Sequence, residues 1–332
     1  KFIYHLKKEL PLLDEDHILG FDEIEVSQKD AKCQLAEKWV EKTVTDSELQ
    51  VSEDDTQIHI KGREFAYTID RRTALFTEMK FAGRKYLNHP MELNIWRAPT
   101  DNDMYIKSEW KKAHYDKAYT RAYTTEVVQG KHGVKITSHA SVVAETVQKI
   151  LDVTITWKIE AAGKIDADIA VTKDDEFPDL PRFGVRMFLD KKLSAVRYFG
   201  MGPQESYCDK HQAASHGLYQ ANVDDLHEDY IRPQENGSHY DCEYVELNNS
   251  RYGIVVSAEN AFSFNASYYT QEELEEKTHN YELTESDSVV FCVDYALNGI
   301  GSNSCGPVVL EQYRFDDVLF RFQFTLIPYI KG

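Results

Sequence analysis

The segment 94–103 combines aromatic, cationic and acidic side chains around a proline, a mixture that could do chemistry. Its letters are Asn-Ile-Trp-Arg-Ala-Pro-Thr-Asp-Asn-Asp, which bring Trp96 and Arg97 close in sequence to Asp101 and Asp103. Carboxylates and amides hydrogen-bond hydroxyl groups, and a tryptophan offers a flat apolar face, so one interpretation is a loop that contacts a sugar. The alternative is a buried Arg97 paired with a carboxylate in a structural turn.

Two glutamates in related turns, Glu205 and Glu235, each end a Pro-Gln-Glu triplet. A retaining glycosidase needs two carboxyl groups about 5–5.5 Å apart, and sequence spacing does not fix such a distance. The alternative is structural, because turn N–H groups or a nearby arginine can donate hydrogen bonds to both carboxylates.

Metal and thiol chemistry find little support. Four histidines share a stretch rich in Asp and Glu, but their spacing matches no ligand motif, so we expect them in loops on a solvated surface: His211, His216, His227 and His239. The run 101–103 is too contiguous for a calcium loop, and no metal site is predicted in this chain. Cys305 lies in the Gly-rich segment 299–307, but the sequence shows neither a histidine nor a helix N-terminus that would activate its thiol.

Strands must position these segments, because apolar and polar residues alternate with a period of two along much of the chain. The clearest alternating segments are 65–69, 75–81, 151–159, 165–171, 289–295 and 320–326. Such a series, with polar turns between its members, predicts an all-β fold, an antiparallel sandwich. Helical patterns are limited to a segment within 107–118 and to 270–277, where Thr270 and Glu273 have the spacing of a capping box.

Composition bounds the class of protein. The 332 residues carry 38 Lys and Arg against 56 Asp and Glu, a net charge of −18 that disfavours nucleic acids and anionic membrane surfaces as partners. No apolar run is long enough for a membrane-spanning helix. The five cysteines are odd in number and widely spaced, so a reducing compartment, the cytoplasm, is expected.

The domain organisation is read from a shift in composition around residues 43–55, where acidic residues interrupt the apolar pattern. We therefore predict two parts, 1–45 and 46–332. The first segment enters an extended pattern directly at Lys1, without a turn or cap, so we expect a cut piece of a longer protein.

A family resemblance rests on several of these segments together. From about Val51 onward the chain resembles the C-terminal part of the family 2 glycoside hydrolases, the bacterial β-galactosidases. The motifs that carry the resemblance occur in the family's order and are Trp-Arg-Ala-Pro-Thr-Asp-Asn-Asp (96–103), Gly-Pro-Gln-Glu-Ser-Tyr (202–207), Pro-Gln-Glu-Asn-Gly (233–237), Asn-Ala-Ser-Tyr-Tyr-Thr-Gln-Glu-Glu-Leu (265–274) and Gly-Ile-Gly-Ser-Asn-Ser-Cys-Gly-Pro (299–307). Residues 16–23 resemble the last strands of the immunoglobulin-like domain that precedes this part, so 1–45 would be its truncated tail.

The resemblance implies a large two-sheet supersandwich similar to galactose mutarotase, preceded in the whole enzyme by a (β/α)₈ barrel. Both catalytic glutamates would lie on that barrel, so no catalytic residue is expected in this chain. Its own contribution would be loops that close one side of the galactoside pocket: Arg97, Thr100, Asp101, Asn102, Asp103, Tyr105, Glu109, Ser304 and Cys305. The family usually places an aromatic residue where this sequence has Cys305, and a thiol cannot stack on a sugar ring, so stacking must come from elsewhere or be absent.

Two functional hypotheses follow. In the first, the chain is the C-terminal portion or small subunit of a β-galactosidase that hydrolyses terminal β-D-galactosides such as lactose with retention. Its partner would be the catalytic barrel portion, which would bind Mg²⁺ and Na⁺, and the full enzyme would be a homo-oligomer. In the second, the chain is a free-standing carbohydrate-binding or mutarotase-like sandwich.

Overall fold

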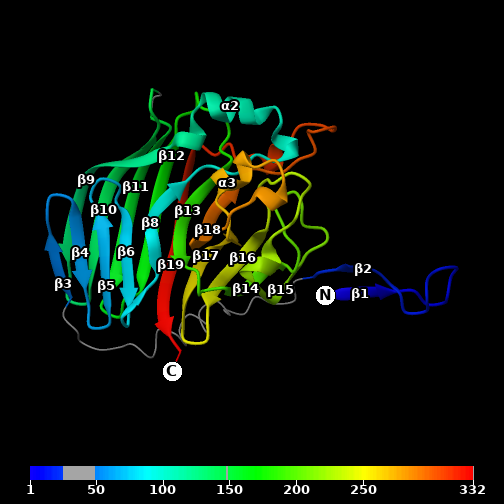
Figure 1. The fold of residues 1–332 in the computed structure, drawn as a ribbon, viewed down its shortest axis with the longest axis horizontal. Helices are drawn as coiled ribbons and strands as arrows, with labels where there is room; N and C mark the ends of the chain where they lie inside the picture. The colour runs from blue at the N-terminus through cyan, green and yellow to red at the C-terminus, as the bar shows by residue number, and fades with distance from the viewer. Residues whose placement is uncertain (25–48, 147–148, 332) are drawn as a thin grey trace.

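The computed structural model describes residues 1–24, 49–146 and 149–331 and is built almost entirely of antiparallel strands (Figure 1). A five-stranded sheet contains β3 (Gln50–Glu53), β4 (Gln57–Lys61), β5 (Phe65–Asp70), β6 (Leu75–Phe81) and β7 (Arg84–Lys85). A twelve-stranded sheet contains β8 (Leu87–Asn94), β9 (Tyr119–Gln129), β10 (Gly133–Val143), β11 (Leu151–Glu160), β12 (Ile165–Lys173), β13 (Arg182–Asp190), β14 (Ala195–Gly202), β15 (Ser215–Asn222), β16 (Ser238–Asn248), β17 (Tyr252–Ser267), β18 (Ser288–Leu297) and β19 (Leu319–Ile330). The predicted all-β antiparallel sandwich is confirmed.

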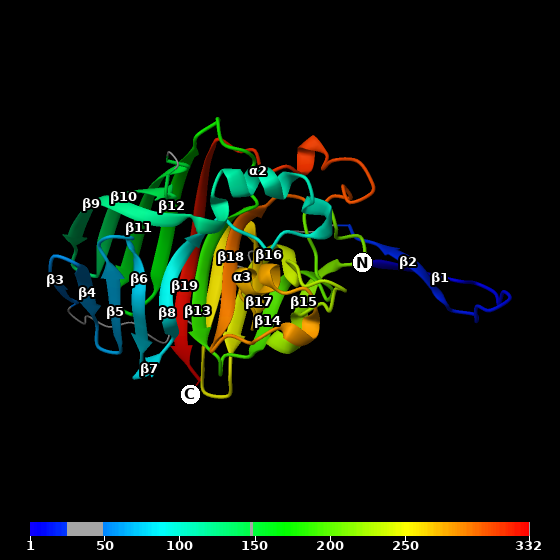
Figure 2. The same cartoon turned by 45° about the horizontal axis from the view of Figure 1, so that its top comes forward.

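The twelve-stranded sheet bends into two layers because β17 has different neighbours along its length. The strand pairs with β16 on one side, while on the other its first part, 252–257, pairs with β19 and its last part, 263–267, pairs with β18. One layer then runs β15-β14-β16-β17-β19-β12-β11-β10-β9, and the branch β18-β13-β8 leads into the other. The five-stranded sheet extends that second layer, because β6 lies beside β8 (Figures 1 and 2).

The core fills the space between the layers, as the alternating sequence predicts. On β11 the residues at 151, 153, 155, 157 and 159 are buried, and the polar residues between them face outward or lie half-buried. Trp157 crosses to the opposite sheet, where its ring meets Phe76 edge-on at 4.9 Å between centroids and its indole N–H donates to the Ala74 carbonyl at 2.8 Å. Fully burying one such large side chain contributes about 1.5–3 kcal/mol.

Helices are short and few in the described residues. They are α2 (Ile106–Lys112) and α3 (Gln271–Glu276), with single 3₁₀ turns at η2 (Asp101–Asp103), η3 (Tyr115–Lys117), η4 (Val223–Leu226), η5 (Asn280–Glu282) and η6 (Glu311–Tyr313). Both predicted helices are confirmed. Half of the predicted capping box is present, since the Glu273 N–H donates to the Thr270 hydroxyl at 3.1 Å, but the Glu273 carboxylate accepts from Thr284 N–H at 2.8 Å. None of the helices in the described ranges is long and apolar enough to cross a membrane.

The N-terminal segment forms a two-stranded hairpin of β1 (Phe2–His5) and β2 (Ile18–Asp22) that projects from the sandwich (Figure 1). Its base contacts β15, where Lys1 donates to the Ser215 hydroxyl at 2.9 Å and the backbone N–H of His216 donates to Glu23 at 3.0 Å. The domain boundary predicted at 45/46 lies outside the described residues, so the division of the chain stays a prediction.

Candidate functional site

Arg97 joins the loop that follows β8 to the Gly-rich loop that follows β18, about 200 residues later in the sequence. Both loops lie at the end of the sandwich where these two strands finish. The chain leaves β8 at Asn94, whose side-chain oxygen accepts from Trp96 N–H at 3.0 Å and sets the turn. Arg97 is fully buried and donates to both oxygens of Asp103, at 2.7 and 3.2 Å, and to the carbonyls of Asn298 and Gly299. The structural interpretation of Arg97 is therefore confirmed.

The turn after Arg97 is closed by its own side chains. Thr100 is the N-cap of the 3₁₀ turn η2, and its N–H and hydroxyl both donate to the Asp103 carboxylate, at 2.9 and 3.1 Å. Asp103 thus accepts from Arg97 and Thr100 together, and its side chain is buried. A buried carboxylate held by this many donors acts as a structural anchor.

Asn102 fixes the Gly-rich loop after β18 to the loop after β8. Its amide N–H donates to the Gly301 carbonyl at 2.8 Å, and its oxygen accepts from the Ser304 hydroxyl at 2.8 Å and from the Ser304 N–H at 3.3 Å. Sequence reasoning placed Asn102 and Ser304 in one site, and the structure brings them into direct contact. Because an amide can donate and accept at once, no residue without both functions could make this bridge.

The two loops enclose an open cavity of about 530 Å³, which we call the loop cavity. Four of the predicted site residues line it, namely Asn102, Asp103, Tyr105 and Glu109, together with Met104, Ile106, Ser108, Asp179, Asn298, Asn303, Val308, Val309 and Arg314. Tyr105 is the one aromatic side chain in this lining and is 62% exposed. Cys305 is exposed on the second loop but does not line the cavity.

Sequence reasoning missed two residues that support the loops and a third that lines the cavity. Asp209 accepts from the N–H groups of Ile300 and Gly301, at 2.9 and 2.7 Å, and so fixes the Gly-rich loop. Gln234 accepts from Asp101 N–H at 3.0 Å. Asp179 lines the cavity, and burial together with the nearby Asp316 raises the pKa of its carboxyl group. No sequence pattern links these positions to the loops, because their partners are distant in the chain.

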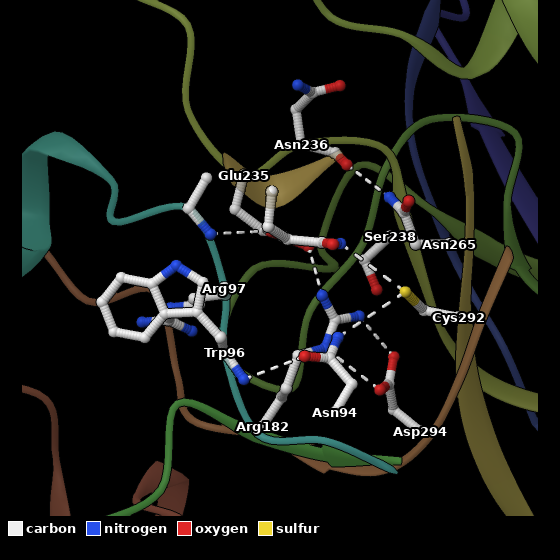
Figure 3. A network of polar contacts seen from close by, with 12 residues as sticks. Asn94, Trp96, Arg97, Arg182, Glu235, Asn236, Ser238, Asn265, Cys292 and Asp294 are labelled. Carbon is white, nitrogen blue, oxygen red and sulfur yellow. Dashed lines mark hydrogen bonds and ion pairs between the residues drawn. The ribbon is translucent and has the colours of Figure 1, made fainter. Parts of the chain in front are cut away.

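A buried ionic network lies beneath the loops (Figure 3). Arg182 donates to both oxygens of Asp294, at 2.5 and 3.0 Å, and to Glu235 at 2.7 Å, while Glu235 also accepts from Ala98 N–H at 3.1 Å. Burial alone would lower the pKa of Arg182, but the two carboxylates raise it well above its usual value, so Arg182 stays charged. Burial raises the pKa of Asp294 to about 6 although Arg182 opposes the shift.

Both glutamates considered for catalysis are held by structural hydrogen bonds, as the second interpretation predicted. Glu235 is bound to Arg182 and to a turn N–H. Glu205, whose side chain is almost completely buried, accepts from Gly237 N–H at 2.8 Å and from Lys210 and Tyr230. Gly237 has a φ of +71°, and a Cβ there would collide with the Leu226 carbonyl, so this turn requires glycine.

The expected surface position of the histidines is wrong for His239. This residue is 1% exposed on β16, its Nδ1 lies 3.2 Å from the Met201 carbonyl, and its ring packs against Tyr198 and Phe264. Burial lowers its pKa to about 4, so the imidazole is neutral at pH 7. His211, His216 and His227 are half-buried, which also differs from the expectation. Within residues 1–24, 49–146 and 149–331, no three His, Cys, Asp or Glu side chains gather as metal ligands.

Comparisons with known proteins match nearly the whole chain. A family model described as the beta galactosidase small chain matches residues 61–326. A curated β-galactosidase from Actinobacillus pleuropneumoniae is 43% identical over 98% of this chain and 31% of its own length, and one from Staphylococcus xylosus is 32% identical over 97% and 32%. The chain thus spans about a third of the length of these two relatives.

Among solved structures, a galactose 1-epimerase from Lactobacillus acidophilus NCFM matches with a TM-score of 0.46 and 8% identity, over 87% of this chain and all of that chain. A likeness of this size carries no argument about function.

Proposed function

The chain belongs to the β-galactosidase small-chain family, and on this premise we propose that it completes the galactoside pocket of a β-galactosidase. The observation that carries the proposal is the loop cavity, an open hollow at the end of a rigid sandwich whose two walls are fixed to each other by Arg97 and Asn102. Preorganised loops on a rigid scaffold bind without losing much conformational entropy. The substrates would be terminal β-D-galactosides such as lactose.

In this proposal the catalytic glutamates lie on a separate barrel portion, which is the partner of this chain. The structure of Glu205 and Glu235 supports that division of roles, because both carboxylates are buried and already hold hydrogen bonds. The chain would shape the pocket and support assembly of a homo-oligomeric enzyme. Mg²⁺ and Na⁺ would bind on the barrel portion, and the cysteine pattern supports a cytoplasmic location. The alternative of a free-standing mutarotase-like sandwich is less well supported, because family and relatives point to the enzyme.

Complementation tests the proposed function. We expect the purified chain alone not to cleave a nitrophenyl β-galactoside, and turnover to appear when the chain is mixed with the barrel portion, since each would hold only part of the pocket. The rate of nitrophenol release measures both outcomes, and the barrel portion alone is the control. Cleavage by this chain alone, or no gain from mixing, would contradict the division of roles.

Tyr105 should supply the ring that the Gly-rich loop lacks at Cys305. We expect Tyr105→Ala to raise the KM for lactose about fivefold in the reconstituted enzyme, because an aromatic contact contributes about 1 kcal/mol, whereas Tyr105→Phe should leave it unchanged. Steady-state kinetics measure the effect, and Tyr281→Ala, an exposed tyrosine outside the loop cavity, is the matched control. Equal KM values for the alanine and phenylalanine variants would exclude a stacking role.

A further inference from the structure

A second cavity, of about 330 Å³, lies where β16, β17 and β18 meet the segment 312–317. We call it the tyrosine cavity, because Tyr240, Tyr295 and Tyr313 line it. Pockets for small molecules usually measure about 300–1,000 Å³, so this one has room for a single ring but not for an extended chain. It shares only Arg314 with the lining of the loop cavity.

The rings in the tyrosine cavity are held in place by packing. Tyr240 stacks on His211 with 5.8 Å between ring centroids, and Tyr295 stacks on Phe320 at 4.9 Å. Each of these tyrosines therefore keeps at most one ring face for the cavity that both line. The buried side chains of Phe262 and Phe315 add to the apolar part of the lining. Such fixed apolar faces match the C–H surface of a saturated ring.

The same cavity carries polar groups with free hydrogen-bonding capacity. In the described part of the chain, no residue hydrogen-bonds to the hydroxyls of Tyr240, Tyr295 and Tyr313 or to the side-chain amide of Gln312. Burial and the nearby Asp317 raise the pKa of Tyr295, so its phenol stays protonated at pH 7 and can both donate and accept. The hydroxyl groups of a ligand need partners that can both donate and accept hydrogen bonds.

Charge in the lining decides between classes of ligand. The lining contains one cation, Arg314, and two carboxylates, Asp241 and Asp317, of which Asp241 lies 2.9 Å from His216. The excess of carboxylates, in a chain with a net charge of −18, disfavours phosphate and other anions. We propose that the tyrosine cavity binds a neutral monosaccharide or a terminal sugar unit. This proposal rests on the lining residues and is independent of the role given to the loop cavity.

Titration calorimetry on the full chain tests the proposal with methyl β-D-galactoside and D-glucose, and with choline chloride and inorganic phosphate as probes without a sugar ring. We expect heat from at least one sugar and none from choline or phosphate. Gln312→Ala and Tyr313→Ala should each weaken sugar binding about fivefold, the usual effect of one lost hydrogen bond. Glu311→Gln and Tyr281→Ala, which alter exposed residues outside the lining, should leave it unchanged.

Two thiols report where the sugar binds. Cys208 lines the tyrosine cavity, whereas Cys305 is exposed on the Gly-rich loop outside it. Sugar should slow the alkylation of Cys208 by N-ethylmaleimide and leave that of Cys305 unchanged. The proposal is overturned by an absence of heat with both sugars, by heat with choline or phosphate alone, by binding that the two lining variants leave intact, or by protection of Cys305 alone. None of these outcomes bears on the complementation test, so the two proposals fail separately.

Discussion

Replacing Arg182 by methionine should lower the free energy of unfolding by about 3–5 kcal/mol, because it leaves two buried carboxylates without their cationic partner. Asp294 and Glu235 are both buried and both accept from this one guanidinium group. Without it, neither carboxylate has a cation in contact among the residues that the structure describes, and the low dielectric of the core makes an unpaired charge costly. Equilibrium unfolding in urea at pH 7 measures the loss.

Arg321 provides a matched control. It also donates to both oxygens of one aspartate, Asp168, but its side chain is 61% exposed. Arg321→Met should cost no more than about 1 kcal/mol, because solvent screens surface pairs. Part of the loss in Arg182→Met should be recovered at pH 5, because burial raises the pKa of Asp294 and its unpaired carboxylate then takes up a proton. Equal losses for the two methionine variants would show that burial of the network contributes nothing.

Acid should destabilise the sandwich through His239. Its folded-state pKa of about 4 lies below the usual value near 6.5, so the unfolded chain binds the proton more readily. The stability that the neutral imidazole provides is complete above pH 6.5 and is lost as the pH falls toward 4. Between pH 7 and pH 4.5 the loss should reach about 2–3 kcal/mol.

Comparison with His239→Phe isolates this effect. The phenylalanine ring can still pack against Tyr198 and Phe264 but cannot titrate. Asp294 acts in the opposite direction, because its raised pKa makes the folded chain more stable as the pH falls from about 6 to 3.8. Both the parent chain and the variant contain Asp294, so its effect cancels in the comparison. Urea unfolding at the two pH values should show a smaller loss in the variant, and an equal loss would contradict the assignment to His239.

Patterns among residues close in sequence predicted the fold better than they predicted the candidate site. Alternation along β11 and β12 and the Thr270 cap depend on neighbours in sequence, so strands and helix emerge from short patterns. The interpretation of Arg97 as a buried cation paired with a carboxylate was accessible for the same reason, since its partner, Asp103, lies only six residues away. Asp209 and Gln234 reach partners more than ninety residues away, and no local pattern encodes such contacts.

His239 was misplaced for a different reason. Its acidic surroundings in sequence suggested a solvated loop, but it lies near the start of β16, where the register shifts between His239 and Cys242. A strand changes which side chains face the core when its register changes by one residue. The position of such an irregularity depends on the neighbouring strand, here β17, and so cannot be read from β16 alone.

The place of β19 has a consequence for the kinetics of folding. It follows every other described strand in sequence, yet it lies between β12 and β17 and joins the two parts of the long layer. Partners far apart in sequence give a high contact order, and the closure of long loops slows folding. Hairpins such as β11–β12 can form early, but the continuous layer can exist only once β19 has inserted. We therefore expect a slow final step, during which the edges of β12 and β17 are open to wrong partners.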